Sequence, residues 1–71
     1  MMMPLTIADK GKEYTIIKVG GNSETKQHLA DLGFVTGSKI SVISEAAGNL
    51  IVNVKDSRVG IGKDLAMKIM I

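Results

Sequence analysis

Cysteine and tryptophan are absent from this chain of 71 residues, which also contains one histidine, one tyrosine and one phenylalanine. Without cysteine, the chain can form no disulfide bridge, zinc–cysteine site, iron–sulfur cluster or catalytic thiol. The single histidine, His28, leaves little of the side-chain chemistry on which most active sites depend. We therefore expect a binding or regulatory module and not an enzyme.

Long apolar runs and clusters of one charge are also missing. No run approaches the roughly 18 apolar residues of a membrane-spanning helix, and residues 1–5 lack the charged flank and apolar core of a signal peptide. The net charge is +2, with lysines spread along the chain. Two aromatic residues provide little stacking surface for nucleic-acid bases. We expect a cytoplasmic protein with neither membrane insertion nor a nucleic-acid partner.

Apolar residues alternate with polar ones over several short segments, which is typical of strands. Residues 14–19 are rich in β-branched side chains and predict a first strand. Ile40 with Val42, and then residues 50–54, predict a hairpin whose turn contains Gly48-Asn49. After a turn at Asp56-Ser57, residues 58–61 predict a further strand, 63–68 a helical turn and 69–71 a final extended segment.

One helix is predicted between the first strand and the hairpin, over residues 23–32. Asn22 and Ser23 both qualify as its N-cap, and Gly33 suits the left-handed position that ends helices. Leu29 and Leu32 recur at helical spacing, and we expect Phe34 to fill the core beneath them. Together the elements predict a single, mainly β domain over residues 1–71: a small barrel or open sandwich of about five strands with a short inserted helix.

A candidate metal site lies on this helix. Glu24, His28 and Asp31 are spaced i, i+4 and i+7, which places them within about 60° of one another around the helix axis. Imidazole and carboxylate ligands suit zinc, iron(II), nickel or manganese. The alternative is a solvated polar face. We expect no tightly bound cofactor, and at most a weakly bound transition metal ion such as iron(II).

A motif follows within the same region: Leu29-x-x-Leu32-Gly33-Phe34-x-x-Gly37-x-x-Ile40. It resembles the Leu-x-x-Leu-Gly-Phe-x-x-Gly-x-x-Ile/Val signature of the FeoA family, and the order of elements agrees over about residues 5–71. The resemblance implies an SH3-like barrel with an inserted helix. The six motif residues mainly specify that fold, because the glycines permit its turns and the apolar side chains close one end of the barrel.

The resemblance also implies a function, namely that of a small, non-enzymatic accessory protein of ferrous iron uptake. Such a protein acts in the cytoplasm, or at the inner face of the membrane, by binding the FeoB membrane iron transporter. We expect contacts from Lys26, His28 and Asp31 on the exposed helix, and not from the hairpin tip at residues 45–49. Two alternatives remain open: a metal-responsive binding domain like that of DtxR-type repressors, or a small-barrel nucleic-acid-binding module. The sequence leaves the oligomeric state open.

Overall fold

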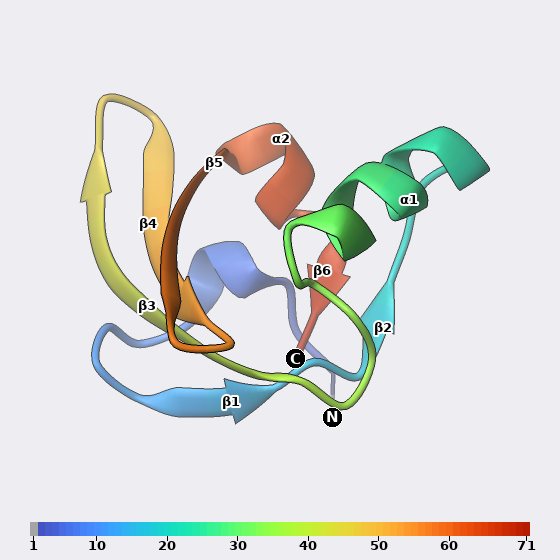
Figure 1. The fold of residues 1–71 in the computed structure, drawn as a ribbon. Coiled ribbons are helices and arrows are strands. Elements are labelled where there is room, and N and C mark those ends of the chain that lie inside the picture. The colour runs from blue at the N-terminus through green and yellow to red at the C-terminus, as the bar shows by residue number, and fades with distance from the viewer. Residues whose placement is uncertain (1) are drawn as a thin grey trace.

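Short strands form most of the fold, and two helical segments are inserted between them (Figure 1). The structure is a computed structural model and describes residues 2–71. In chain order the elements are a 3-10 turn η1 (Leu5–Ile7), β1 (Glu13–Thr15), β2 (Lys18–Val19), α1 (Ser23–Asp31), β3 (Lys39–Ala46), β4 (Asn49–Val54), β5 (Ser57–Gly62), α2 (Lys63–Ala66) and β6 (Ile69–Met70).

The strands form two antiparallel sheets. The larger sheet has the order β1-β3-β4-β5, and the smaller one pairs β2 with β6. Figure 1 shows β3, β4 and β5 on one side of the molecule, the β2–β6 pair on the other, and both helices at the same end. The mainly β fold with an inserted helix is confirmed.

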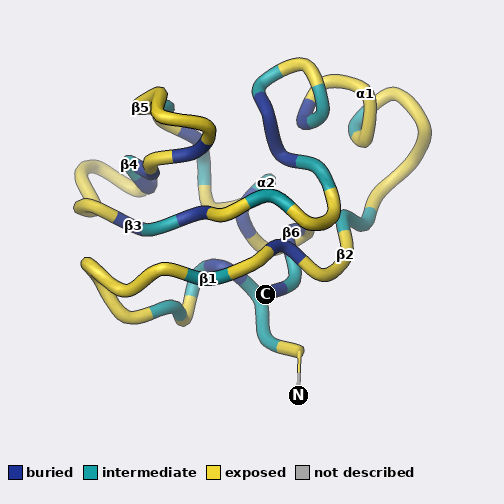
Figure 2. Tube along the Cα trace, turned by 60° about the horizontal axis from the view of Figure 1, so that its bottom comes forward, coloured by how far each residue is buried: buried dark blue, intermediate teal, exposed yellow. Residues whose placement is uncertain are grey.

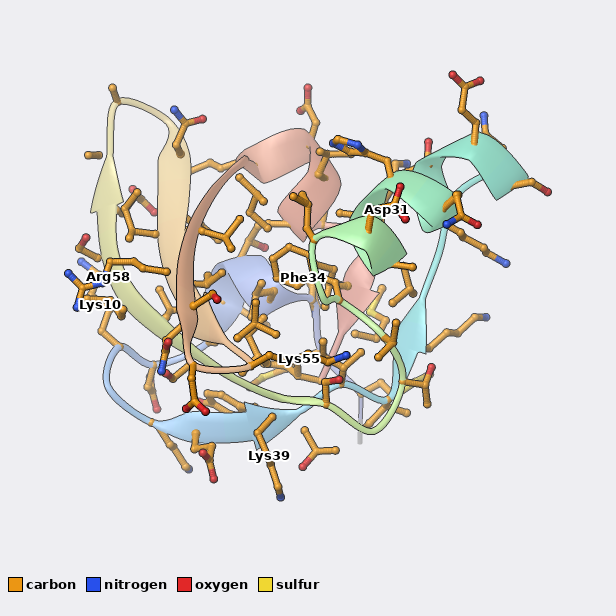
Figure 3. The ribbon with its side chains drawn as sticks, viewed as in Figure 1. Lys10, Asp31, Phe34, Lys39, Lys55 and Arg58 are labelled. Carbon is orange, nitrogen blue, oxygen red and sulfur yellow. The ribbon has the colours of Figure 1, made fainter. Side chains whose placement is uncertain are left out.

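The core contains only hydrophobic side chains, and no polar side chain is buried among residues 2–71. In β4, Leu50, Val52 and Val54 are buried, as the alternation predicts, and the side chains between them are more exposed. Phe34, the largest of the fully buried side chains, lies between α1, α2 and the sheet (Figure 3). In Figure 2 buried segments alternate with more exposed ones along the trace. The complete core is Leu5, Ile16, Leu29, Phe34, Ile40, Val42, Leu50, Val52, Val54, Ile61, Ala66, Ile69 and Ile71.

The predicted first strand over residues 14–19 is wrong as a single element. The chain changes partner at its centre: the Ile16 N–H donates to the Ser38 carbonyl at 2.9 Å, whereas the Ile17 N–H donates to Met70 at 2.8 Å. Consecutive residues therefore hydrogen-bond to different sheets, which splits the segment into β1 and β2. This split raises the strand number from the expected five to six.

Two tight turns connect β3, β4 and β5. The first hairpin is confirmed, but its turn is Ala47-Gly48, both at positive φ of 51° and 81°, and Asn49 already belongs to β4. The second turn lies one residue earlier than predicted, at Lys55 and Asp56, with φ of 50° and 62°. Positive φ at both central residues is typical of the type I′ turn, whose twist matches that of the flanking strands. Ser57 therefore belongs to β5 and not to the turn.

The helices and the last strand are shorter than predicted. Helix α1 ends at Asp31, with Leu32 as its half-buried C-cap. Helix α2 covers Lys63–Ala66 and β6 only Ile69–Met70. These ends differ from the prediction by one or two residues, which is the usual variation at the ends of short helices and strands.

Candidate protein-binding surface

Helix α1 is fixed at its beginning by one of the two predicted caps. The Asn22 side-chain Oδ1 accepts a hydrogen bond from the Thr25 backbone N–H at 2.8 Å. Ser23 instead occupies the first helical position. Glu24 stands in the first turn, where a negative charge interacts favourably with the positive end of the helix dipole.

The end of α1 is fixed by the residues of the Leu-Gly-Phe motif. The Gly33 N–H donates to the Ala30 carbonyl and the Phe34 N–H to the Leu29 carbonyl, both at 2.9 Å. This pair of bonds is the Schellman motif, which requires a left-handed residue after the helix. Gly33 supplies it with a φ of 104°. Because Leu29 and Phe34 are also buried in the core, α1 is held rigidly against the barrel.

The predicted metal ligands all lie on the exposed face of α1. Glu24, His28 and Asp31 are all exposed, and the Asp31 Oδ1 accepts a hydrogen bond from the Gln27 Nε2 at 2.9 Å. Figure 3 shows Asp31 on the outer side of the helix. No group of three or more potential metal ligands gathers anywhere in residues 2–71. Metal binding by these residues stays a prediction.

Lys26 and His28 lie at opposite edges of the exposed face of α1. At about 100° per residue they are separated by about 160° across the buried side of the helix, and the exposed Gln27 and Asp31 lie between them on the solvent side. Lys26 also lines a surface groove together with Ala30. Helix α1 thus presents one broad exposed face, with His28 at one edge and Lys26 at the other, beside the groove.

The groove has a volume of about 370 Å³ and runs between β2, α1 and the segment after the helix. Its lining is mainly apolar and includes Ile17, whose side chain is 47% exposed. The lining residues are Ile17, Lys18, Val19, Lys26, Ala30, Phe34, Val35 and Thr36. Apart from Lys26, the sequence analysis missed this groove as a site. The signal was the Ile16-Ile17 pair, because consecutive residues of an extended segment point to opposite sides and one must leave the core.

A second hollow, of about 350 Å³, lies beside β1 and β3 and is polar. It is lined by Glu13, Ser38, Lys39, Ile40, Ser41, Asn53, Lys55 and Asp56. The Lys39 Nζ donates to the Thr15 Oγ1 at 3.0 Å. The charges of two lysines and two carboxylates cancel in this lining, so it favours neither an anionic nor a cationic ligand.

The hairpin tip, the other exposed candidate, is partly engaged within the molecule. Glu45 forms an ion pair with Lys63 at 3.4 Å, and the Lys63 N–H donates to the Gly48 carbonyl at 3.3 Å. Ala47 and Gly48 themselves are exposed. The tip therefore offers small side chains and one carboxylate that is already paired.

No helix within residues 2–71 is long and apolar enough to cross a membrane.

Three comparisons relate this chain to known proteins. The model of the FeoA domain family matches residues 3–71. A protein of Methanocaldococcus jannaschii with the provisional name Fe(2+) transport protein A is 39% identical over 99% of this chain and 85% of its own length. A crystal structure of an iron uptake regulatory protein, FeoA, superimposes with a TM-score of 0.88 at 31% identity, covering 99% of this chain and 93% of the other.

A more distant structure identifies the type of barrel. It is FeoA of Stenotrophomonas maltophilia complexed with zinc, described as a prokaryotic SH3 domain protein. The TM-score is 0.80 at 20% identity, over 94% of this chain and 86% of the other. At that identity the likeness concerns the fold alone, and it confirms the SH3-like barrel. The motif at Leu29–Ile40, the Schellman cap that it builds and the match over residues 3–71 agree, and the chain belongs to the FeoA domain family.

Proposed function

We propose that this protein is a non-enzymatic accessory factor of ferrous iron uptake, and that it acts by binding a FeoB-type membrane iron transporter at the cytoplasmic face. The observation that carries the proposal is the family match over residues 3–71, with a relative named for Fe(2+) transport at 39% identity. The match covers nearly the whole sequence, so the shared function belongs to the barrel with its inserted helix.

The surface proposed for this contact is the exposed part of α1. A rigid element loses little conformational entropy on binding, which favours its use as a contact surface. Asn22 caps the beginning of α1, the Gly33–Phe34 bonds cap its end, and Leu29 anchors its centre in the core. Lys26, His28 and Asp31 project from this fixed scaffold into solvent.

Co-purification tests the proposal directly. The tagged chain is expressed with the FeoB-type transporter of the same genome, and the transporter is measured in the fraction that the tag retains from detergent-solubilised membranes. We expect retention by the wild-type chain. The double variant Lys26→Glu/His28→Glu changes both edges of the exposed face of α1 and should weaken retention. Thermal melting must first show that each variant is folded.

Ala47→Glu probes the other candidate surface, because it adds one negative charge at the exposed hairpin tip. It should retain the transporter as the wild type does. Loss of retention by Ala47→Glu alone would move the interface to the hairpin. If the wild-type chain retains no transporter, the proposed function is wrong.

A further inference from the structure

The groove beside α1 combines an apolar floor with two basic side chains at its edge. Ile17, Val19 and Val35 supply exposed or half-buried apolar surface, and Lys18 and Lys26 are both exposed. No acidic residue takes part in the lining. Apolar surface flanked by charge of one sign is a common arrangement at sites that bind partner proteins.

Both lysines are available to a ligand. Within residues 2–71, the one ion pair joins Lys63 to Glu45, so neither Lys18 nor Lys26 has a carboxylate at ion-pair distance. Burial of an unpaired ammonium group by a partner is costly unless that partner provides a negative charge. The groove therefore selects for an acidic ligand.

The strand that lines the groove also has a free backbone edge. Val19 pairs with Ile69, and the next residue, Gly20, donates its N–H to the Lys68 carbonyl at 2.7 Å. In an antiparallel ladder, the residue beside such a bonded position directs its own N–H and C=O away from the partner strand. Those of Val19 therefore point away from β6, and no third strand of residues 2–71 pairs with β2 on that side. Such an edge can hydrogen-bond to an extended chain.

Resting on the proposed function, we propose that the groove binds an extended acidic segment of the membrane partner. Branched apolar side chains of that segment pack on Ile17 and Val35, and its carboxylates pair with Lys18 and Lys26. A volume of about 370 Å³ lies at the lower end of ligand pockets, which span about 300–1,000 Å³. It therefore suits a few side chains of a peptide and not the face of a folded domain.

The test is a titration of the full chain, labelled with nitrogen-15, with a short peptide of alternating glutamate and valine, followed by amide chemical shifts. We expect the shifts to concentrate at residues 17–19, 26, 30 and 34–36. The variant Lys18→Glu/Lys26→Glu should weaken binding about tenfold or more, since a rim charge pair contributes to affinity and its reversal adds repulsion. A peptide of alternating lysine and valine should not bind.

Two further variants separate the contributions. Lys10→Glu/Arg58→Glu makes the same change of charge at two exposed positions on the far side of the molecule from α1 (Figure 3), and should bind the peptide like the wild type. Ile17→Ser removes apolar surface from an exposed position and should weaken binding at unchanged net charge. Equal weakening by Lys10→Glu/Arg58→Glu would show a general charge effect and overturn the groove as the site.

Other occupants give different results. Shifts of the same amides with vesicles containing anionic lipid but not with the acidic peptide would assign the groove to a membrane surface. Shifts that change on dilution without any ligand would assign it to a second copy of the chain. Either result overturns the proposal, as does the absence of shifts with the acidic peptide.

Co-purification separates this inference from the proposed function. If the wild type and Lys18→Glu/Lys26→Glu retain the transporter equally, the proposed function is supported and the groove is not the binding site. If the wild type retains no transporter, the proposed function and its named partner fall, while the peptide titration still decides whether the groove binds acidic segments.

Discussion

Replacing Val52 with aspartate should destabilise the protein severely at neutral pH. Val52 lies on β4, an inner strand of the larger sheet, opposite Val42 and Val59, and its side chain is fully buried. A carboxylate at this position has no partner, because no polar side chain within residues 2–71 is buried beside it. The least costly outcome in the folded state is protonation of the new carboxyl group.

The cost of that protonation follows from the pKa. An aspartate with a pKa of about 3.9 in the unfolded chain requires about 4 kcal/mol to remain protonated at pH 7, at 1.36 kcal/mol per pH unit. Loss of the buried valine side chain adds about 1.5 kcal/mol or more. At about 0.05–0.15 kcal/mol per residue, a chain of 71 residues has a total stability of roughly 4–11 kcal/mol. The substitution thus removes half of the stability or all of it.

Thermal melting followed by circular dichroism measures the effect. Asn53→Asp is the control, since it places the same carboxylate on the next residue of β4, which is exposed and pairs with Arg58. It should change the stability by less than about 0.5 kcal/mol. Burial gives the new aspartate a higher pKa in the folded state than in the unfolded chain. Its destabilising effect is therefore large well above the unfolded-state pKa and fades near it. The difference in melting temperature between Val52→Asp and wild type should narrow as the pH falls toward 4. Equal melting of the two variants at pH 7 would show that Val52 is not in the core.

Three further expectations concern α1, the second hairpin turn and the metal. Asn22→Ala should lower the stability by about 1 kcal/mol through loss of the N-cap, whereas Ser23→Ala should leave melting unchanged; the opposite result would place the cap at Ser23. Replacing Lys55-Asp56 with Asn-Gly should raise the melting temperature by several degrees, because Asn-Gly favours the positive φ values that the type I′ turn requires. A lower melting temperature in this variant would contradict the idea that positive φ strains the backbone at Lys55. Anaerobic titration calorimetry with iron(II) should give a dissociation constant above ~10 µM, because His28 is the only nitrogen ligand on α1 and its carboxylate neighbours are solvated. A sub-micromolar site that is lost in His28→Ala would establish a metal-binding domain instead.

Local signals in the sequence were sufficient to predict most of the helices and strands. The α1 boundaries depend on a cap and a left-handed glycine that adjoin the helix, and the hairpin depends on alternation around a turn. Each of these signals involves residues that lie close together in the chain. The burial of Phe34 also follows locally, because the Schellman bonds place it over Leu29.

Features that depend on partners far away in the chain could not be predicted from local sequence signals. The break between β1 and β2 arises because Ile16 bonds to Ser38 and Ile17 to Met70, far apart in the chain. Ile43 is exposed although it belongs to β3, because the register with β4 shifts between Val42 and Ser44. In each segment the sequence shows two consecutive apolar residues, Ile16-Ile17 and Val42-Ile43, which do not by themselves reveal the distant partner.

The groove and the split strand have one structural origin. If residues 14–19 continued as one strand, Ile17 would still face the side opposite to Ile16, but β2 could not pair with β6. The change of partner takes Ile17 and Lys18 to the smaller sheet and brings both next to Lys26 of α1. A contact between residues far apart in the sequence thus builds the candidate peptide site. Helical spacing separates Lys26 from His28, but only the pairing of β2 with β6 shows that Lys26 faces this groove.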